Sequence, residues 1–430
     1  MKCTSYDMNA YKLHIIKTDK FKTITVGVAF RRKIVKEEIT IRNLLKELMI
    51  NATESYPDER KLIIATEELY DLKLLASNYR IGNDTILSFR TRFLNEKYTE
   101  EGMNKESIKF LIDMIFKPKL DVDFDKCKKK IEKSIISLKD NKIKYSLFKL
   151  LETTKDMPYS YNSYGYIDDL EKITIDDIKS YYESLIRDDI VDVYVVGDAV
   201  DGEIKNIFRE YFKLTTFHKQ DISLISKELE TTKKVLEFRE KDNVNQTQLV
   251  MLYGLHNLTD DDRKYILPVY CEMLGGSSNS ILFDNVREKN SYAYYVNALV
   301  KSYDNIFIIY SGIENGNDKN VIKIINKSFK SIGKGDFSLE KLDGAKETII
   351  SSIMASLDNP MGIISNYYAM ELVNSLDALD RIERIKKVTK EDIVNVSKKI
   401  SENRIFILEA DNEENNDKED KWGYLLWKTW

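Results

Sequence analysis

The sequence is poor in the residues that build disulfide frameworks and local metal sites. It has 3 cysteines and 3 histidines in 430 residues. Because Cys3, Cys127 and Cys271 are odd in number and far apart, a disulfide framework is excluded and a reducing compartment is favoured. No two histidines are close enough in sequence to form a zinc signature. GxSxG, GxxxxGK[ST] and GxGxxG motifs are absent as well, so no serine-hydrolase or nucleotide-binding signature is present.

Charge and hydropathy limit the possible partners. The 67 Lys and Arg residues nearly balance 71 Asp and Glu residues, and the two signs are mixed, so no general field attracts nucleic acid. The N-terminus lacks the apolar stretch of a signal peptide, and no apolar run approaches the ~20 residues of a membrane span. We therefore expect a cytoplasmic protein of two or three domains with no nucleic-acid or membrane partner.

Hydrophobic periodicity predicts an α+β fold for the first half. Some stretches alternate like half-buried strands and others recur at helical spacing. The strands are expected at 24–30, 87–93 and 191–196, and the helices at 41–49, after Pro57, and from Phe124 to Asp140. In chain order, the first four of these elements are a strand, a helix, a second helix and a strand.

The second half of the chain repeats this plan. KITIDDIKSYYESLIRDDIVDVYVVGD in the first half resembles KVTKEDIVNVSKKISENRIFILEAD in the second, and Thr174 and Thr389 lie half the chain length apart. Each threonine is predicted to cap a helix, with an aspartate three residues later. The sequence therefore predicts two tandem homologous domains, each a mixed, mostly antiparallel sheet with helices packed on one face.

Composition changes suggest where the domains end. We expect an N-terminal domain over 1–214, a linker over 215–234, a C-terminal domain over 235–410 and a tail over 411–430. The tail starts as DNEENNDKEDK, too charged to pack, and ends in WGYLLWKTW. It holds every tryptophan of the chain: Trp422, Trp427 and Trp430. A docking segment, a segment folded back on its own domain and an artificial extension remain open.

One segment carries a family resemblance. LGGSSNSILFDNVREKNSYAYYVNALV, from Leu274 to Val300, resembles the C-terminal-domain signature of the M16 zinc peptidases, the insulysin and mitochondrial processing peptidase group. ESYP, GYIDDL and VDVYVVGD are most similar to the bacterial branch of inactive insulinase-like proteins. The resemblance covers about residues 10–410. It implies the duplicated α+β domains of the M16 or LuxS-like metallohydrolase fold.

The resemblance also implies that the zinc site is degenerate. Active members carry His-x-x-Glu-His, in which the histidines bind zinc and the glutamate is the general base. Asn43 and Glu47 match the histidine positions, Lys46 matches the base, and Lys139 matches the third ligand. An ammonium group at these positions repels a zinc ion. We expect the four residues to form a solvated or ion-paired polar cluster, and this chain alone to lack zinc-dependent hydrolysis.

The other half of the family's active site is present. Arg287 and Tyr294, in REKNSYAY, have the family's arginine-to-tyrosine spacing. The resemblance implies that they face a zinc site on the opposite half of a clam-shaped assembly, where Arg287 binds substrate carbonyls and Tyr294 donates to the developing oxyanion. A structural ion pair of Arg287 and a one-position error toward Tyr292 or Tyr295 remain open.

These features lead to two functional hypotheses. The first is a noncatalytic subunit of a heterodimeric M16-type zinc peptidase, whose catalytic partner carries His-x-x-Glu-His and the zinc. This chain would close the peptide chamber and bind peptides as an added strand at a sheet edge, and the resemblance suggests leader-peptide processing of a modified peptide. The alternative is a stand-alone homodimeric peptide-binding or scaffolding protein without protease activity.

Overall fold

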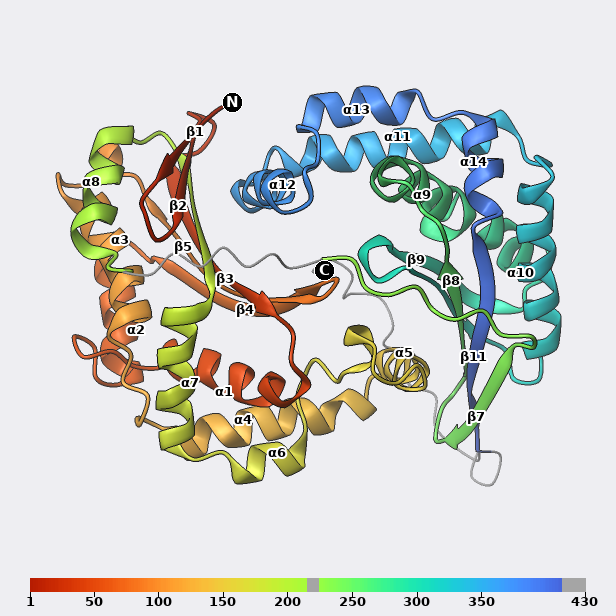
Figure 1. Ribbon diagram of the computed structural model, residues 1–430, viewed down its shortest axis with the longest axis horizontal. Coiled ribbons are helices and arrows are strands. Elements are labelled where there is room, and N and C mark those ends of the chain that lie inside the picture. Colours follow the sequence, from red (N-terminus) through yellow and green to blue (C-terminus); the bar gives the residue numbers. More distant parts are fainter. Residues whose placement is uncertain (215–223, 412–430) are drawn as a thin grey trace.

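Two β-sheets with their helices form the two halves of the molecule, seen in a computed structural model (Figure 1). The structure describes residues 1–214 and 224–411. The strand order is β1-β2-β6-β3-β5-β4 in the N-terminal sheet and β7-β11-β8-β10-β9 in the C-terminal sheet. The predicted α+β fold with two domains is confirmed. The predictions for Trp422, Trp427 and Trp430, and for the first part of the linker, lie outside the described residues.

The N-terminal half contains the predicted strands and helices and several more. Its strands are β1 (Lys2–Asp7), β2 (Lys12–Lys17), β3 (Thr23–Lys33), β4 (Lys73–Ile81), β5 (Asp84–Leu94) and β6 (Ile190–Gly197). Its helices are α1 (Ile39–Met49), α2 (Glu59–Glu68), α3 (Met103–Phe116), α4 (Phe124–Ile136), α5 (Lys142–Glu152), α6 (Ile167–Lys172), α7 (Ile175–Asp188) and α8 (Asp201–Tyr211), with 3₁₀ turns η1 (Lys36–Glu38) and η3 (Ser137–Lys139).

Two of the predictions for this half were wrong in detail. The order strand, helix, helix, strand omitted β4, which lies between α2 and β5. None of the residues of β4 is buried, so its sequence lacks the clear alternation of a half-buried strand. The helix expected from Phe124 to Asp140 ends at Ile136, and the chain then tightens into η3 before α5 begins.

The C-terminal half repeats the same arrangement. Its strands are β7 (Leu236–Asp242), β8 (Thr247–Leu255), β9 (Ala293–Lys301), β10 (Ile306–Ile313) and β11 (Ile400–Ala410). Its helical segments are η5 (Asp262–Ile266), α9 (Leu267–Cys271), η6 (Glu272–Gly276), η7 (Phe283–Glu288), η8 (Ser302–Asp304), α10 (Asp318–Gly333), α11 (Leu339–Ser356), α12 (Pro360–Val373), α13 (Ala378–Lys386) and α14 (Lys390–Ser397).

The pairing of the strands confirms the internal repeat. β2 and β6 are parallel, and so are β7 and β11. The pairs β6–β3, β3–β5 and β5–β4 are antiparallel, as are the pairs β11–β8, β8–β10 and β10–β9. The predicted helix caps are present as full capping boxes. Thr174 pairs with Asp177 at the start of α7, and Thr389 pairs with Asp392 at the start of α14. In both halves the capped helix leads directly into an interior strand of the sheet, β6 or β11.

Each half also lends one helix to the other half. α12 packs on the N-terminal sheet, where Ile363 and Tyr368 join a cluster with Ile16 and Tyr194. In the same way, α5 packs on β8 and β11 of the C-terminal sheet (Figure 1). The prediction of helices on one face was thus incomplete, because these exchanged helices cover part of the second face. The exchange joins the halves through buried apolar surface, which stabilises their relative placement.

The turn between β4 and β5 forms a second junction between the halves. The guanidinium of Arg80 binds the carboxylate of Asp304 in η8 through two hydrogen bonds of 2.5 and 2.6 Å. Gly82 has a φ of +54°, and a Cβ there would lie 1.8 Å from the carbonyl oxygen of Leu224. Only glycine fits this turn. Its close contact with Leu224, together with the pair of Arg80 and Asp304, fixes the end of β4 near the β9–β10 connection.

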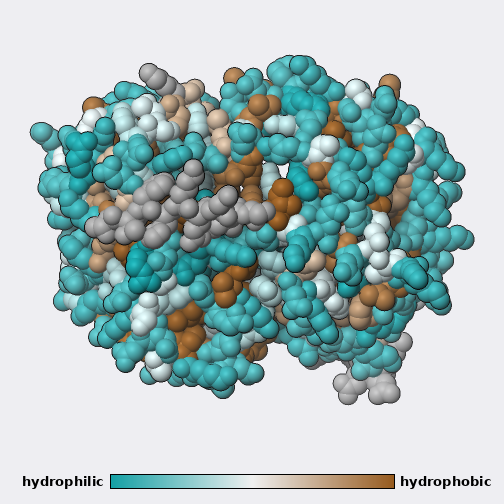
Figure 2. Space-filling view, viewed as in Figure 1, coloured by the Kyte–Doolittle hydropathy of each residue, from teal (hydrophilic) through white to brown (hydrophobic). Residues whose placement is uncertain are grey.

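The visible surface and the open sheet edges differ in character. The face in Figure 2 is mostly hydrophilic, and its hydrophobic residues lie in separate groups. Among the described residues, no helix is long and apolar enough to cross a membrane. Leu75 on β4 is 57% exposed and Tyr294 on β9 is 65% exposed, and each strand is at the edge of its sheet. The two edges that flank the junction therefore carry exposed apolar side chains.

Titratable groups lie beneath α12. Burial raises the pKa of Asp192 on β6 to about 6, although Arg31 and Lys12 lower it. Burial also lowers the pKa of His14 on β2 to about 4, because the charged imidazolium is disfavoured there. The two groups affect stability in opposite directions. The contribution of Asp192 to the free energy of unfolding falls as the pH rises from about 4 to about 6. The contribution of His14 falls as the pH drops below about 6.5.

Replacing Asp192 with Asn should separate these two effects. Asn mimics the protonated acid, so the variant should match the wild type near pH 4 and be more stable by about 1–3 kcal/mol from pH 6 upward. Urea unfolding of both proteins at pH 4, 5, 6 and 7, followed by far-UV circular dichroism, measures the difference. A constant difference across this range would contradict the raised pKa of Asp192.

Candidate functional site

The residues on α1 that the resemblance matches to the zinc motif include part of an ion-paired cluster around a buried carboxylate. Glu47 is 8% exposed, and one of its oxygens lies 2.9 Å from the ammonium of Lys46. Its other oxygen binds Lys130 of α4, a residue that the sequence prediction did not include. Burial alone would raise the pKa of Glu47, but the bonds to Lys130 and Lys46 outweigh it and lower that pKa. Glu47 is thus held as an anion between two cations.

Asn43 takes part in a separate chain of neutral hydrogen bonds. Its side-chain amide donates to the carbonyl of Ser163 at 2.8 Å and accepts from Asn78 of β4 at 3.0 Å. Asn78 in turn accepts from the hydroxyl of Thr85 on β5 at 3.1 Å. This chain ties the first turns of α1 to the edge strand β4. The side-chain amide of Asn43 therefore already makes hydrogen bonds that hold β4 in place.

Lys139 is placed away from the contacts of Glu47. It lies in η3, after the end of α4. The hydrogen bond from Lys142 lowers the pKa of Asp242 at the end of β7, and the charge of Lys139 adds a smaller lowering of that pKa. The cation on the downstream helix that reaches Glu47 is Lys130. Helical spacing could have found it, since Lys130 is three residues after buried Cys127 and next to buried Ile131, on the side that faces α1.

These residues do not fit a zinc ion. A zinc site needs neutral imidazoles, thiolates or free carboxylates as ligands. Here the carboxylate of Glu47 is already occupied by two ammonium groups, and the amide of Asn43 is occupied by backbone and side-chain partners. Over residues 1–214 and 224–411, no group of three or more His, Cys, Asp and Glu side chains could hold a metal ion.

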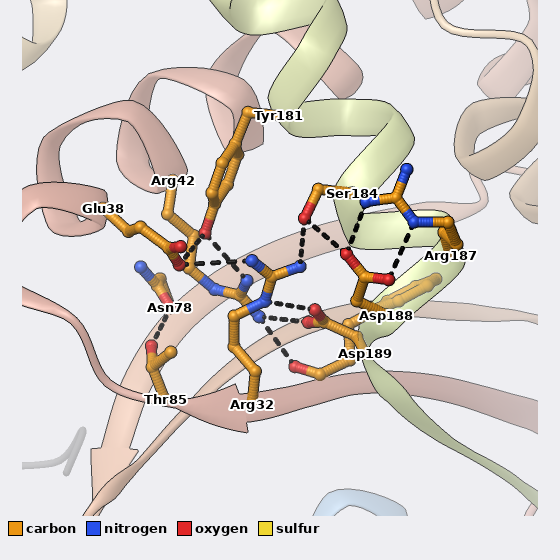
Figure 3. A network of polar contacts seen from close by, with 11 residues as sticks. Arg32, Glu38, Arg42, Asn78, Thr85, Tyr181, Ser184, Arg187, Asp188 and Asp189 are labelled. Carbon is orange, nitrogen blue, oxygen red and sulfur yellow. Dashed lines mark hydrogen bonds and ion pairs between the residues drawn. The ribbon is translucent and has the colours of Figure 1, made fainter. Parts of the chain in front are cut away.

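A buried ion network holds α1 in place (Figure 3). Asp189, at the end of α7, binds Arg42 of α1 at 2.8 Å and also binds Arg32 of β3. Arg42 further donates to the carbonyl of Phe30 at 2.9 Å and to the hydroxyl of Tyr181 at 3.2 Å. Burial would lower the pKa of Arg42, but Asp189 and Tyr181 outweigh it and raise that pKa. The residue before Asn43 is thereby fixed against the sheet.

Arg287 and Tyr294 lie in the other half, at the end of η7 and the start of β9. The guanidinium of Arg287 lies over the ring of Phe283, 4.8 Å from its centroid. Among the ion pairs of the described residues, none involves Arg287, so its pairing there is with an aromatic ring. The amide of Ser291 donates to the carbonyl of Arg287 at 2.9 Å, which ties η7 to the turn before β9.

The neighbouring tyrosines are engaged differently from Tyr294. The hydroxyl of Tyr295 binds the side chain of Gln248 within the sheet, and burial raises the pKa of Tyr295. Tyr292 packs against the C-terminal core. Tyr294 is 65% exposed on an edge strand, and the described residues provide no hydrogen-bond partner for its hydroxyl. Of the three, Tyr294 has the hydroxyl most available to a bound molecule.

Comparisons with known proteins point to inactive M16 peptidases. Residues 172–349 match the family model of the Peptidase M16 inactive domain. The chain is 29% identical over 409 residues to the probable inactive metalloprotease YmfF of Bacillus subtilis, covering 92% of this chain and 95% of that protein.

Solved structures share the whole architecture. A conserved protein from Enterococcus faecalis V583 has a TM-score of 0.89 at 25% identity, covering 96% of this chain and 100% of that one. The peptidase M16 inactive domain from Pseudomonas fluorescens has a TM-score of 0.77 at 15% identity, covering 96% and 98%. The duplicated sheets and these matches together show that the chain is similar to inactive M16 peptidases over most of its length, with the family's inactive domain matched over residues 172–349.

Proposed function

We propose that this protein is the noncatalytic subunit of a heterodimeric M16-type zinc peptidase in the cytoplasm. The observation that carries the proposal is the contrast between its two half-sites. On α1, Glu47 is neutralised by Lys46 and Lys130, whereas Arg287 lacks a carboxylate partner among the described residues and Tyr294 is exposed. A site that keeps its substrate-binding residues without its metal ligands suits a subunit that completes another protein's active site.

In this proposal the partner supplies the metal and the general base. This chain closes the peptide chamber, and Arg287 binds a substrate carbonyl while the hydroxyl of Tyr294 donates to the oxyanion. An extended peptide would pair with a free sheet edge, where main-chain hydrogen bonds provide affinity. Leader-peptide removal from a modified peptide is the substrate role that we favour.

Reconstitution tests the assignment. The chain should show no peptidase activity alone, should co-purify in equal amounts with an M16 protein carrying His-x-x-Glu-His from its host, and should raise that protein's peptide hydrolysis at least tenfold. Purification of the tagged chain from host lysate with mass spectrometry, followed by assays of the separate and mixed proteins, gives the answer. Recovery of the chain alone as a symmetric dimer that binds peptides without hydrolysis would instead support the stand-alone scaffolding function.

A further inference from the structure

The edge strand β4 offers an unusual combination of free backbone and unpaired positive charge. It pairs only with β5 in the described sheet, and every residue of β4 is at least partly exposed. Gly82 and Asn83 form a two-residue turn between β4 and β5, with Ile81 opposite Asp84. Residues that flank such a turn exchange hydrogen bonds, so alternate residues counted back from Ile81 bond to β5. Leu74, Ala76, Asn78 and Arg80 then direct their backbone groups to the open edge.

Side chains of β4 alternate between two faces of the sheet. Asn78 faces α1, because it donates to Asn43 at 3.0 Å. Tyr79 faces α12, because it packs against the apolar cluster that α12 forms with the sheet. A peptide added beside β4 would likewise present its side chains alternately to the α1 face and to the α12 face.

Positive charge exceeds negative charge on the α12 face beside this edge. Arg92 is opposite Lys73, and Arg90 is opposite exposed Leu75. Arg92 is exposed and makes no hydrogen bond or ion pair within the described part of the chain. Arg90 donates to the hydroxyl of Ser88 at 3.0 Å and has no carboxylate partner there. Only Lys73 is neutralised, by Asp71 at 2.5 Å.

Positive charge also exceeds negative charge on the α1 face. Lys46 and Lys130 share the single carboxylate of Glu47, so one positive charge is left over. The side chain of Lys130 is 66% exposed and that of Lys46 is 20% exposed. Sliding an added strand by one residue exchanges its two faces. Because both faces carry surplus cations, a peptide with acidic side chains is favoured in either register.

We infer that the open edge of β4 binds an extended acidic peptide, whose carboxylates meet Arg90 and Arg92 on one face and Lys46 and Lys130 on the other. This inference rests on the proposed function, since it names the class of peptide that the chamber accepts. Lys46 stands at the position that the resemblance matches to the general base of active relatives, and Lys130 binds the adjacent Glu47. In this inference the surplus positive charge of the two lysines anchors a carboxylate of the peptide.

Three labelled peptides test the charge preference. Ten-residue fluorescein-labelled peptides of alternating Thr with Glu, Gln or Lys are titrated with the full chain, and binding is measured by fluorescence anisotropy at low salt. The Glu peptide should bind about tenfold more tightly than the Gln peptide, and added salt should reduce this preference. The Lys peptide should bind most weakly. Equal or tighter binding of the Lys peptide would overturn the inference.

Two variants place the binding on β4. Arg92→Glu should weaken binding of the Glu peptide about tenfold, whereas Lys319→Glu, an equal charge reversal at an exposed residue of α10, should leave it unchanged. Ala76→Pro removes an edge amide and should weaken all peptides. Equal effects of the two charge reversals would overturn the inference. So would an oligonucleotide of the same charge as the Glu peptide that binds as tightly and is not weakened by Ala76→Pro.

These results distinguish the inference from the proposed function. If the Gln or Lys peptide bound as tightly as the Glu peptide, and Ala76→Pro abolished that binding, the peptide-binding function would stand and only the acidic preference would be wrong. Absence of binding by all three peptides, with the catalytic partner present or absent, would contradict both.

Discussion

Replacing Asp189 with Ala should lower the free energy of unfolding by about 3–5 kcal/mol, the largest stability change that we expect from one substitution. Asp189 has a fully buried side chain and binds both Arg32 and Arg42. The side chain of Arg42 is itself 1% exposed, so its charge cannot turn to water when the carboxylate is removed. The cost is therefore that of leaving a buried guanidinium unpaired, and not merely of losing one hydrogen bond.

Urea unfolding followed by far-UV circular dichroism measures this loss. Asp189→Asn should have a smaller effect, because the amide still accepts one hydrogen bond. Glu383→Ala is the matched control, since Glu383 pairs with Lys386 at 2.7 Å while both side chains are more than half exposed. An exposed pair contributes little, so the control should unfold at the wild-type urea concentration. Equal midpoints for Asp189→Ala and the control would show that the network contributes nothing to stability.

The network also explains which parts of the fold could be predicted from the sequence. The capping boxes at Thr174 and Thr389 were predictable, because their partners are three residues away. The contact between Arg32 and Asp189 spans 157 residues, and no local pattern marks it. The exchange of α5 and α12 between the halves is likewise a matter of long-range packing. Both helices look like ordinary amphipathic or apolar segments until the opposite sheet is known.

The candidate site shows the same division. The absence of histidine at positions 43 and 47, which the resemblance matches to zinc ligands, could be predicted from the sequence alone. The ion-paired cluster around Glu47 includes Lys130, which the prediction missed because it placed the matching cation at Lys139, on a helix extended to Asp140. Helix ends depend on local tightening and on the next segment, and they are the least predictable part of a helix. The end of α4 at Ile136 removes Lys139 from the helix that packs on α1.

The second large effect concerns the reconstituted peptidase. Tyr294→Phe removes one hydroxyl and little else, and we expect kcat of the complex to fall about 10²–10³-fold with KM nearly unchanged. The reason is that a donor to the oxyanion acts in the transition state and not in the bound ground state. Arg287→Ala should lower kcat/KM about as much but also raise KM, because a guanidinium that binds a substrate carbonyl contributes before the reaction as well.

The neighbouring tyrosines provide the controls for this prediction. Tyr292→Phe and Tyr295→Phe remove the same hydroxyl group from positions two residues before and one residue after Tyr294. Because Tyr295 binds Gln248 inside the sheet, its loss should affect stability and leave kcat unchanged. If Tyr292→Phe lost activity and Tyr294→Phe kept it, the site would be shifted along the chain. If all the variants, including Arg287→Ala, kept full activity, this chain would contribute only its chamber wall, and substrate chemistry would belong to the partner alone.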